Sequence, residues 1–152
     1  MKRAVAAVVI VAALLIGYRY YDRSYAPVST YKKFAEEILH RHYDSAAALS
    51  DGLTAKDLDR LGSQEKIGAG PAMFQTLFPS RYEIQSAEMG PGGTLTLHAV
   101  QTVLFNPPGV ESAVRPAMYA KMNQTVTLRN MSGWKITSFE NKFESMDSLG
   151  SR

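Results

Sequence analysis

Two of the chain's three histidines, His40 and His42, stand close enough in sequence to suggest a metal site. On a helix, however, residues two positions apart point to different faces. The HExxH pattern of zinc hydrolases is also absent. We therefore expect no bound metal. His42, on the apolar face of its predicted helix, is expected to be a core histidine that bonds a backbone group.

A second set of side chains could carry acid–base chemistry, which needs a group within hydrogen-bonding distance of a proton and a pKa adjusted by burial. The predicted strands offer Glu83, Glu88, His98, Tyr82 and Tyr119. Glu88 and His98 flank a predicted turn at residues 90–93, so they could meet across a hairpin with His98 as the base. The alternative is that both are surface residues on the outer sheet face. We therefore predict no catalytic residue.

Other kinds of site are excluded by composition and motif. The chain has no cysteine, which excludes disulfides, thiolate metal sites and cysteine nucleophiles. The glycine-rich stretches "GAGP" and "GPGG" lack the lysine and the strand-to-helix context of a phosphate-binding loop. The sequence therefore predicts no cofactor.

The basic character of the chain is confined to its amino terminus. The formal net charge is +3, but from Ser24 onward 13 lysines and arginines stand against 13 aspartates and glutamates. The excess comes from Lys2, Arg3, Arg19 and Arg23, less Asp22, around an apolar segment, where anionic headgroups would lie. A basic nucleic-acid face is not visible in the remainder, so we expect no nucleic-acid partner.

Helices are predicted in the first half of the chain, after Pro27. One buried face at three- and four-residue spacing comprises Tyr31, Phe34, Ala35, Ile38, Leu39 and His42. Asp44 is expected to cap a second helix at 45–49. Thr54 and Asp57 resemble a capping box for a short helix that ends near Gly62.

A further helix is predicted to begin at Pro71 and to end at Pro79, because proline suits a first helical turn and cannot continue a helix. From Arg81 onward the apolar period becomes two, which predicts strands at 82–89, 94–105, 119–129 and 133–143. Trp134 is expected to be buried. Helices followed by an antiparallel meander indicate an α+β domain with the helices on one face of the sheet.

This order resembles the nuclear-transport-factor-two-like superfamily, whose cone-shaped fold is shared with ketosteroid isomerase. The segment "HYDSAAALSDG" matches the end of that family's first helix at Tyr43, Asp44, Ala47 and Leu49. The segment "QTVTLRNMSGWKITSFEN" matches its last hairpin at Val126, Leu128, Gly133, Trp134, Lys135, Ile136 and Phe139. The resemblance covers residues 28–144 and implies about three helices on a curved antiparallel sheet. Its motifs are structural and imply no activity.

The amino terminus has the features of a signal sequence, since Lys2 and Arg3 precede an uncharged run at 4–17. Cleavage after Gly17 would place a leucine where a small residue is needed, so retention is predicted. Residues 4–21 then form a single transmembrane anchor with an interfacial tyrosine belt. We expect an anchor with its flanks at 1–26, a domain at 27–145 outside the cytoplasm, and a flexible tail at 146–152.

A retained anchor without a catalytic constellation predicts a non-enzymatic accessory or scaffold subunit of a bacterial inner-membrane complex. The resemblance agrees, because the superfamily supplies membrane-anchored modules such as the inner-membrane scaffold of type IV secretion systems. The expected partners are membrane lipid and other subunits or a second copy. The candidate interface residues are Ala13 and Gly17 in the anchor, and Thr94, Thr96, His98 and Thr102 on the sheet.

An alternative is a membrane-tethered receptor or carrier for a small apolar ligand held in the cone. The superfamily's cone often leaves a pocket with apolar walls and a few polar groups. The expected lining residues are Met73, Phe74, Phe78 and Tyr119.

Overall fold

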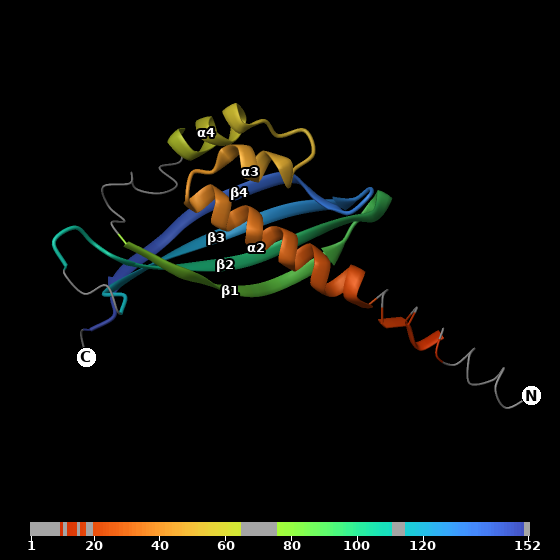
Figure 1. Cartoon of the computed structure of the whole chain (residues 1–152), viewed down its shortest axis with the longest axis horizontal. Helices are drawn as coiled ribbons and strands as arrows, with labels where there is room; N and C mark the ends of the chain where they lie inside the picture. Colours follow the sequence, from red (N-terminus) through yellow and green to blue (C-terminus); the bar gives the residue numbers. More distant parts are fainter. Residues whose placement is uncertain are drawn as a thin grey trace, which may run out of the picture.

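A computed structural model describes residues 10, 12–14, 16–17, 20–64, 76–110 and 115–150 (Figure 1). The elements are η1 (Tyr21–Tyr25), α2 (Ala26–Leu39), α3 (Tyr43–Ala48), α4 (Ala55–Gln64), β1 (Thr76–Met89), η2 (Pro91–Gly93), β2 (Thr94–Asn106), β3 (Met118–Asn130) and β4 (Trp134–Ser148). Within the described residues, no helix is both long enough and apolar enough to span a bilayer. The candidate lining residues Met73 and Phe74 lie outside the described residues.

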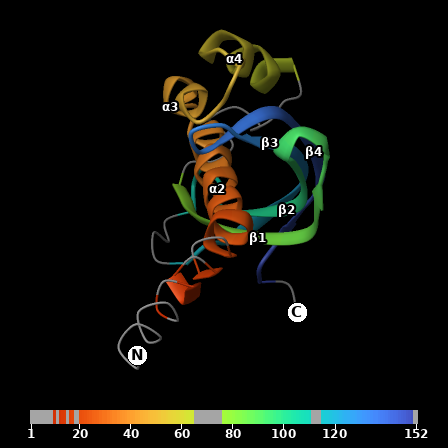
Figure 2. The ribbon, with the colours of Figure 1, turned by 90° about the vertical axis from the view of Figure 1, so that its right-hand side faces the viewer.

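The four strands form one antiparallel sheet in the order β1-β2-β3-β4, which is the predicted meander. The sheet curls around α2, while α3 and α4 sit beside the carboxyl end of that helix (Figure 2). The helices therefore cover the concave face of the sheet, and this α+β arrangement is the predicted one.

Helix α2 forms as its apolar spacing predicts, with Pro27 in the first turn and Tyr31, Phe34 and Ile38 buried on one face. Its end differs from the prediction. The helix stops at Leu39, and Arg41 has a left-handed φ of 61° that turns the chain. His42 therefore lies beyond the helix with a 65% exposed side chain, and the prediction of a core histidine is wrong.

The two short helices follow α2. The capping box is confirmed: the Asp57 amide donates to Thr54 Oγ1 at 3.2 Å, and the Thr54 amide donates to Asp57 Oδ2 at 3.2 Å. The predicted cap at Asp44 is wrong, because α3 already begins at Tyr43 and His42 occupies the N-cap position.

The largest correction concerns the start of the sheet. Phe78 and Pro79, predicted to end a helix, lie in β1. Proline is tolerated there for two reasons: β1 is an edge strand, and a register shift between Phe78 and Arg81 interrupts the ladder at that point.

The other correction is at the carboxyl end, where β4 pairs with β3 through Ser148, so the predicted tail begins too early.

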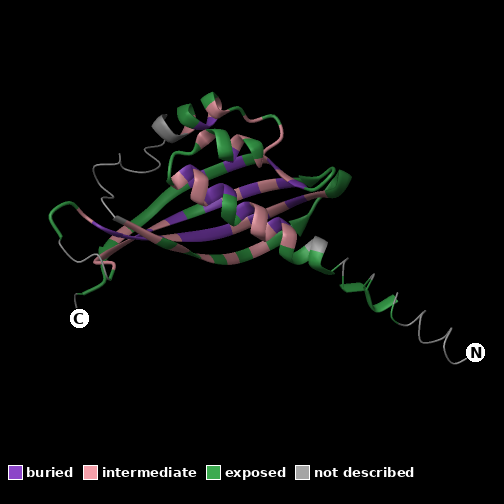
Figure 3. Ribbon diagram, viewed as in Figure 1, coloured by how far each residue is buried: buried purple, intermediate pink, exposed green. Residues whose placement is uncertain are grey.

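The core lies between α2 and the concave face and includes the predicted Trp134 (Figure 3). Phe34 and Phe139 meet edge to face at 5.1 Å between ring centroids. The start of the β4 edge is covered by the segment after α3, because the Asp51 amide donates to the Ile136 carbonyl at 2.7 Å and the Ile136 amide donates to Leu49 at 3.0 Å. A second, smaller apolar cluster lies around Val103, Phe105, Ala120 and Met122.

Candidate functional site

A row of buried amide side chains separates the two apolar clusters on the concave face. Gln101 of β2, Gln124 of β3 and Asn141 of β4 are 1%, 3% and 4% exposed. Each occupies an inward position that is apolar elsewhere along its strand, as Leu97 and Val103 show on β2. Since a buried amide is costly unless it is hydrogen-bonded, the partners of this row determine what it can do.

Gln124 is the centre of the network. Its Nε2 donates to Gln101 Oε1 at 2.7 Å and to Asn141 Oδ1 at 3.0 Å. Its Oε1 accepts a hydrogen bond from the buried Tyr31 hydroxyl of α2. Asn141 Nδ2 in turn reaches the sulfur of Met122 at 3.5 Å. The helix and three strands are thereby joined by polar contacts inside the core.

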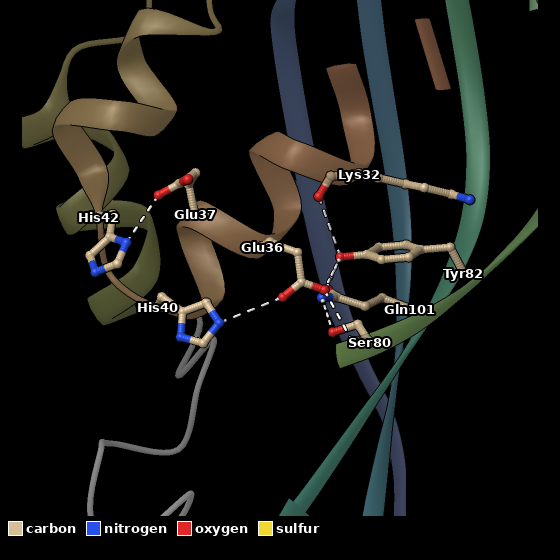
Figure 4. A network of polar contacts seen from close by, with 8 residues as sticks. All are labelled: Lys32, Glu36, Glu37, His40, His42, Ser80, Tyr82 and Gln101. Carbon is tan, nitrogen blue, oxygen red and sulfur yellow. Dashed lines mark hydrogen bonds and ion pairs between the residues drawn. The ribbon is translucent and has the colours of Figure 1, made fainter. Parts of the chain in front are cut away.

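From Gln101 the network runs outward to Glu36 on α2 (Figure 4). Gln101 Nε2 donates to the Tyr82 hydroxyl and to Ser80 Oγ, both at 3.1 Å. The Tyr82 hydroxyl donates to Glu36 Oε1 at 2.8 Å, and the Ser80 amide donates to the same oxygen at 3.2 Å. Glu36 therefore ends a continuous chain of hydrogen bonds from the interior.

Both tyrosines of the network resist ionisation. Burial raises the pKa of Tyr82 well above its usual value, and the neighbouring Glu36 raises it further. The pKa of Tyr31 is raised by the same two causes in the same order. Both hydroxyls therefore stay protonated at neutral pH and act as hydrogen-bond donors rather than as bases.

The tyrosines and glutamines of the network leave no polar side-chain group free for a ligand. Among the described residues, every buried side-chain nitrogen and oxygen has a hydrogen-bond partner. The proton of each tyrosine hydroxyl and both ends of each glutamine amide are bonded within the network. The arrangement holds the helix on the sheet, and no acid or base in it points toward open space except Glu36.

Glu36 borders an open hollow of about 560 Å³ between α2 and α3, which Lys32, Glu37 and Ser45 also line. Glu36 Oε2 lies 3.7 Å from His40 Nε2, and Glu37 Oε2 lies 3.0 Å from His42 Nδ1. The two histidine rings stack at 5.9 Å, because the turn at the end of α2 brings them together. Within the described residues, no group of three metal-ligating side chains is present.

The acid–base candidates of the sheet are not assembled into a pair. Glu88 pairs across the hairpin with Thr96, whereas His98 pairs with Ser86. His98 Nδ1 lies 3.3 Å from Thr125 Oγ1 of the next strand. Glu88 and His98 are therefore not directly opposite each other but two residue positions apart along the ladder.

Phe78 and Tyr119 were expected inside the cone, and the strand register places them elsewhere. Both are directly opposite Leu104, while the inward positions beside them are Leu77 and Phe105. Because side chains alternate between the faces of a strand, Phe78, Leu104 and Tyr119 form a row on the outer face. The assignment of these two residues to an interior pocket is thus corrected.

The interface candidates lie where the strand alternation placed them. Thr94, Thr96, His98 and Thr102 alternate with buried residues on β2, so they share the outer face of the sheet. Ala13 and Gly17 belong to the helical residues before η1 and are exposed. Their role in a contact stays a prediction.

A polar hollow of about 270 Å³ crosses this outer face and touches all four strands. Its lining includes Gln85 of β1, His98 of β2, Asn123 of β3, and Glu140 and Lys142 of β4. It offers charged groups of both signs beside amides and an imidazole, which suits a polar partner segment better than an apolar ligand.

Comparison with solved structures agrees with the fold. A ketosteroid isomerase-like protein from Erwinia carotovora atroseptica aligns with a TM-score of 0.50 and 13% identity, over 79% of this chain and 95% of the other. The chain shares that fold. A domain of unknown function with a cystatin-like fold from Nostoc punctiforme aligns at a TM-score of 0.48 and 14% identity, over 82% and 78% of the two chains. No protein-family model matches, and no curated protein matches.

The sequence reasoning missed the buried amides, although a signal for them was present. Gln101 and Gln124 stand at positions whose neighbours two residues away are all apolar: Ala99, Val103, Met122 and Val126. When each of two neighbouring strands carries one polar residue among the apolar residues of its inward face, the two polar side chains are expected to be buried and hydrogen-bonded to each other.

Proposed function

We propose that the protein is a non-enzymatic accessory or scaffold subunit of an inner-membrane complex. Its amino-terminal segment holds it in the membrane, its domain lies outside the cytoplasm, and it docks other subunits on the outer face of its sheet. The observation that carries this proposal is the long outer face, which none of the described helices covers (Figure 2).

The composition of that face supports docking. One part carries Phe78 and Tyr119, both half-buried, on either side of Leu104, which is itself buried, and the hollow lined by His98 and Lys142 adds polar and charged groups. Protein interfaces combine an apolar core with a polar rim in this way. A face that only had to be solvated would not need the aromatic rings of Phe78 and Tyr119, which stay partly exposed on it.

The interior supports a structural rather than a catalytic role. A general base needs a lone pair that is free to reach its substrate. Here the buried polar groups bond one another, and both network tyrosines stay protonated. The solved structure named as ketosteroid isomerase-like shares only the fold at 13% identity, and fold alone does not carry an activity.

The test is affinity purification of the full chain from gently solubilised membranes, with co-eluting chains identified by mass spectrometry. Thr96→Arg places a charge on the half-buried outer face and is expected to reduce co-elution by about tenfold or more. Ser45→Arg places the same charge on the exposed α3 and serves as the matched control, with no change expected. A monodisperse monomer without partners in every detergent would contradict the proposal.

A further inference from the structure

An apolar groove of about 430 Å³ lies between the first turns of the helical segment and the end of the β1–β2 hairpin. Leu95 and Leu97 are buried in it, and across the hairpin they pair with Met89 and Ala87, which are exposed. Ser24 stands on the helical side. The groove thus extends the inward, core-forming face of the sheet beyond the part that α2 covers.

The chemistry of the groove is that of a hydrocarbon site. The described residues that line it include no charged side chain, and the hydroxyl of Ser24 is the one polar side-chain group among them. Met89, at its rim, is 60% exposed. Apolar side chains on the inner face of a sheet are normally covered, so the exposure of Met89 and Ala87 leaves room on this face for an apolar group to pack.

The position of the groove indicates where its occupant comes from. Ser24 follows Gly17, the last residue of the uncharged run, by seven residues. Along a helix this separation is about 10 Å. Tyr20, Tyr21 and Tyr25 are exposed on the same helical segment, and tyrosine prefers the boundary between headgroups and hydrocarbon. If the run at 4–17 is in a bilayer, the groove lies at that boundary.

The size of the groove separates two occupants. One turn of an α-helix, about 10 Å wide and about 5.4 Å long, already displaces roughly 400 Å³, so the anchor helix of a second copy would fit for one turn only. A flexible hydrocarbon chain can follow the whole groove, whose volume is within the usual range of small-molecule sites of about 300–1,000 Å³.

We infer that this groove binds one acyl chain of a phospholipid from the bilayer that holds the amino-terminal segment. The inference rests on the membrane attachment in the proposed function and adds a lipid site to it. The bound chain covers Met89 and Ala87, and it fixes the domain close to the membrane surface.

The test uses the full chain in vesicles of phosphatidylcholine and phosphatidylglycerol that contain a phosphatidylcholine with a photoactivatable diazirine in one acyl chain. Flotation measures attachment, and mass spectrometry after irradiation locates the lipid adducts residue by residue. We expect adducts on groove residues such as Met89 and Val28. Ala87→Trp, which fills the groove, and Met89→Glu, which places a carboxylate in it, should each lower those adducts by about tenfold.

The matched control is Met131→Glu, in the β3–β4 turn. Met131 is 56% exposed and does not belong to the groove lining. This variant should keep the groove adducts within about twofold of the parent chain, because a change outside the groove leaves its contacts intact. Far-UV circular dichroism checks that each variant is folded. Met89→Glu carries the test alone if Ala87→Trp fails to fold, since Met89 is largely solvent-exposed.

The possible outcomes distinguish failure of the lipid site from failure of the membrane attachment on which it rests. If the chain floats with the vesicles but adducts occur only before Tyr20, or if the groove variants leave the adducts unchanged, the lipid site is wrong and the attachment stands. Cross-links between two protein chains at the groove would overturn it in favour of a second copy. If the chain does not float, the attachment fails and the lipid site fails with it.

Discussion

At the scale of single residues, Gln124 shows how this fold accommodates polarity in its core. Its amide is bonded by three buried side chains from α2, β2 and β4, so one residue links the helix to both neighbouring strands. A buried amide of this kind contributes little net stability when fully bonded. Its removal, however, takes a hydrogen bond from every one of its partners at once. The network is therefore a sensitive point of the structure.

We predict that Gln124→Leu destabilises the fold strongly, although leucine is apolar and of similar size. The hydroxyl of Tyr31 and the side-chain oxygens of Gln101 and Asn141 would lose the partner that Gln124 supplies, at about 1–3 kcal/mol for each unsatisfied group. The free energy of unfolding, measured by urea denaturation, should fall by roughly 3–5 kcal/mol. Lys121→Leu, on the outer face of the same strand, is the control, with a change of about 0.5 kcal/mol or less. A loss below about 1 kcal/mol for Gln124→Leu would contradict the role of the network.

The same network predicts how stability depends on pH. Tyr31 and Tyr82 have pKa values raised above the ordinary 10.0, mainly by burial. Above pH 10.0 the unfolded chain therefore loses protons that the folded chain keeps, so their contribution to stability is complete below that pH and is lost as the pH rises. Urea denaturation from pH 8 to about 11 should show a falling free energy of unfolding, with a shallower fall in the Tyr31→Phe/Tyr82→Phe double variant. Equal slopes would show that these tyrosines are not the groups responsible.

At the scale of the elements, α4 offers a local test through its capping box. The pKa of Asp57 is lowered from the ordinary 3.8, first by the hydrogen bond from the Thr54 hydroxyl and next by the one from its amide. The capping box therefore stabilises the fold at pH values above the pKa of Asp57 in the unfolded chain. This stabilisation is lost as the pH falls through the lower pKa of Asp57 in the folded chain. Thr54→Ala should raise the Asp57 pKa toward 3.8, as measured by NMR titration, and should speed amide exchange in the first turn of α4. An unchanged Asp57 titration would mean that the box does not persist in solution.

The elements also show what could be predicted from sequence and what could not. The alternation of Leu95 and Leu97 with threonines places a strand and its faces correctly, because burial on one face leaves a period of two. Prediction from the local sequence pattern fails where tertiary packing or a backbone turn determines the structure. His42 continues the helical period, but Arg41 turns the chain before it. Pro79 ends a helix in most contexts, whereas here an edge strand with a register shift accepts it.

The candidate site was harder to predict than the fold, for a related reason. The buried amides matter through their partners on other strands, and a single sequence gives strand register only indirectly. Phe78 and Tyr119 illustrate the same limit, since a shift of one residue decides between the interior and the outer face. The pairing of both residues with Leu104 fixes the register of their strands. No pattern within the sequence of β1 or β3 specifies that pairing.

At the scale of the whole molecule, the parts proposed to bind are spatially separate. The amino-terminal helix leaves the domain at the end where the apolar groove lies, and the carboxyl terminus lies at the opposite end (Figure 1). The interior is filled by the network and the apolar clusters. The proposed attachment at one end would leave the outer sheet face free to meet neighbours along the membrane.

The most direct test of the scaffold proposal is site-specific photo-cross-linking in intact cells. A photoreactive amino acid is placed at Thr96 on the outer face or, as the matched control, at the exposed Lys56 on α4. The proposal predicts a discrete cross-linked product with another membrane-complex chain from position 96 and none from position 56. Products from position 56 alone, or none from position 96 in cells where the chain is membrane-bound, would contradict it.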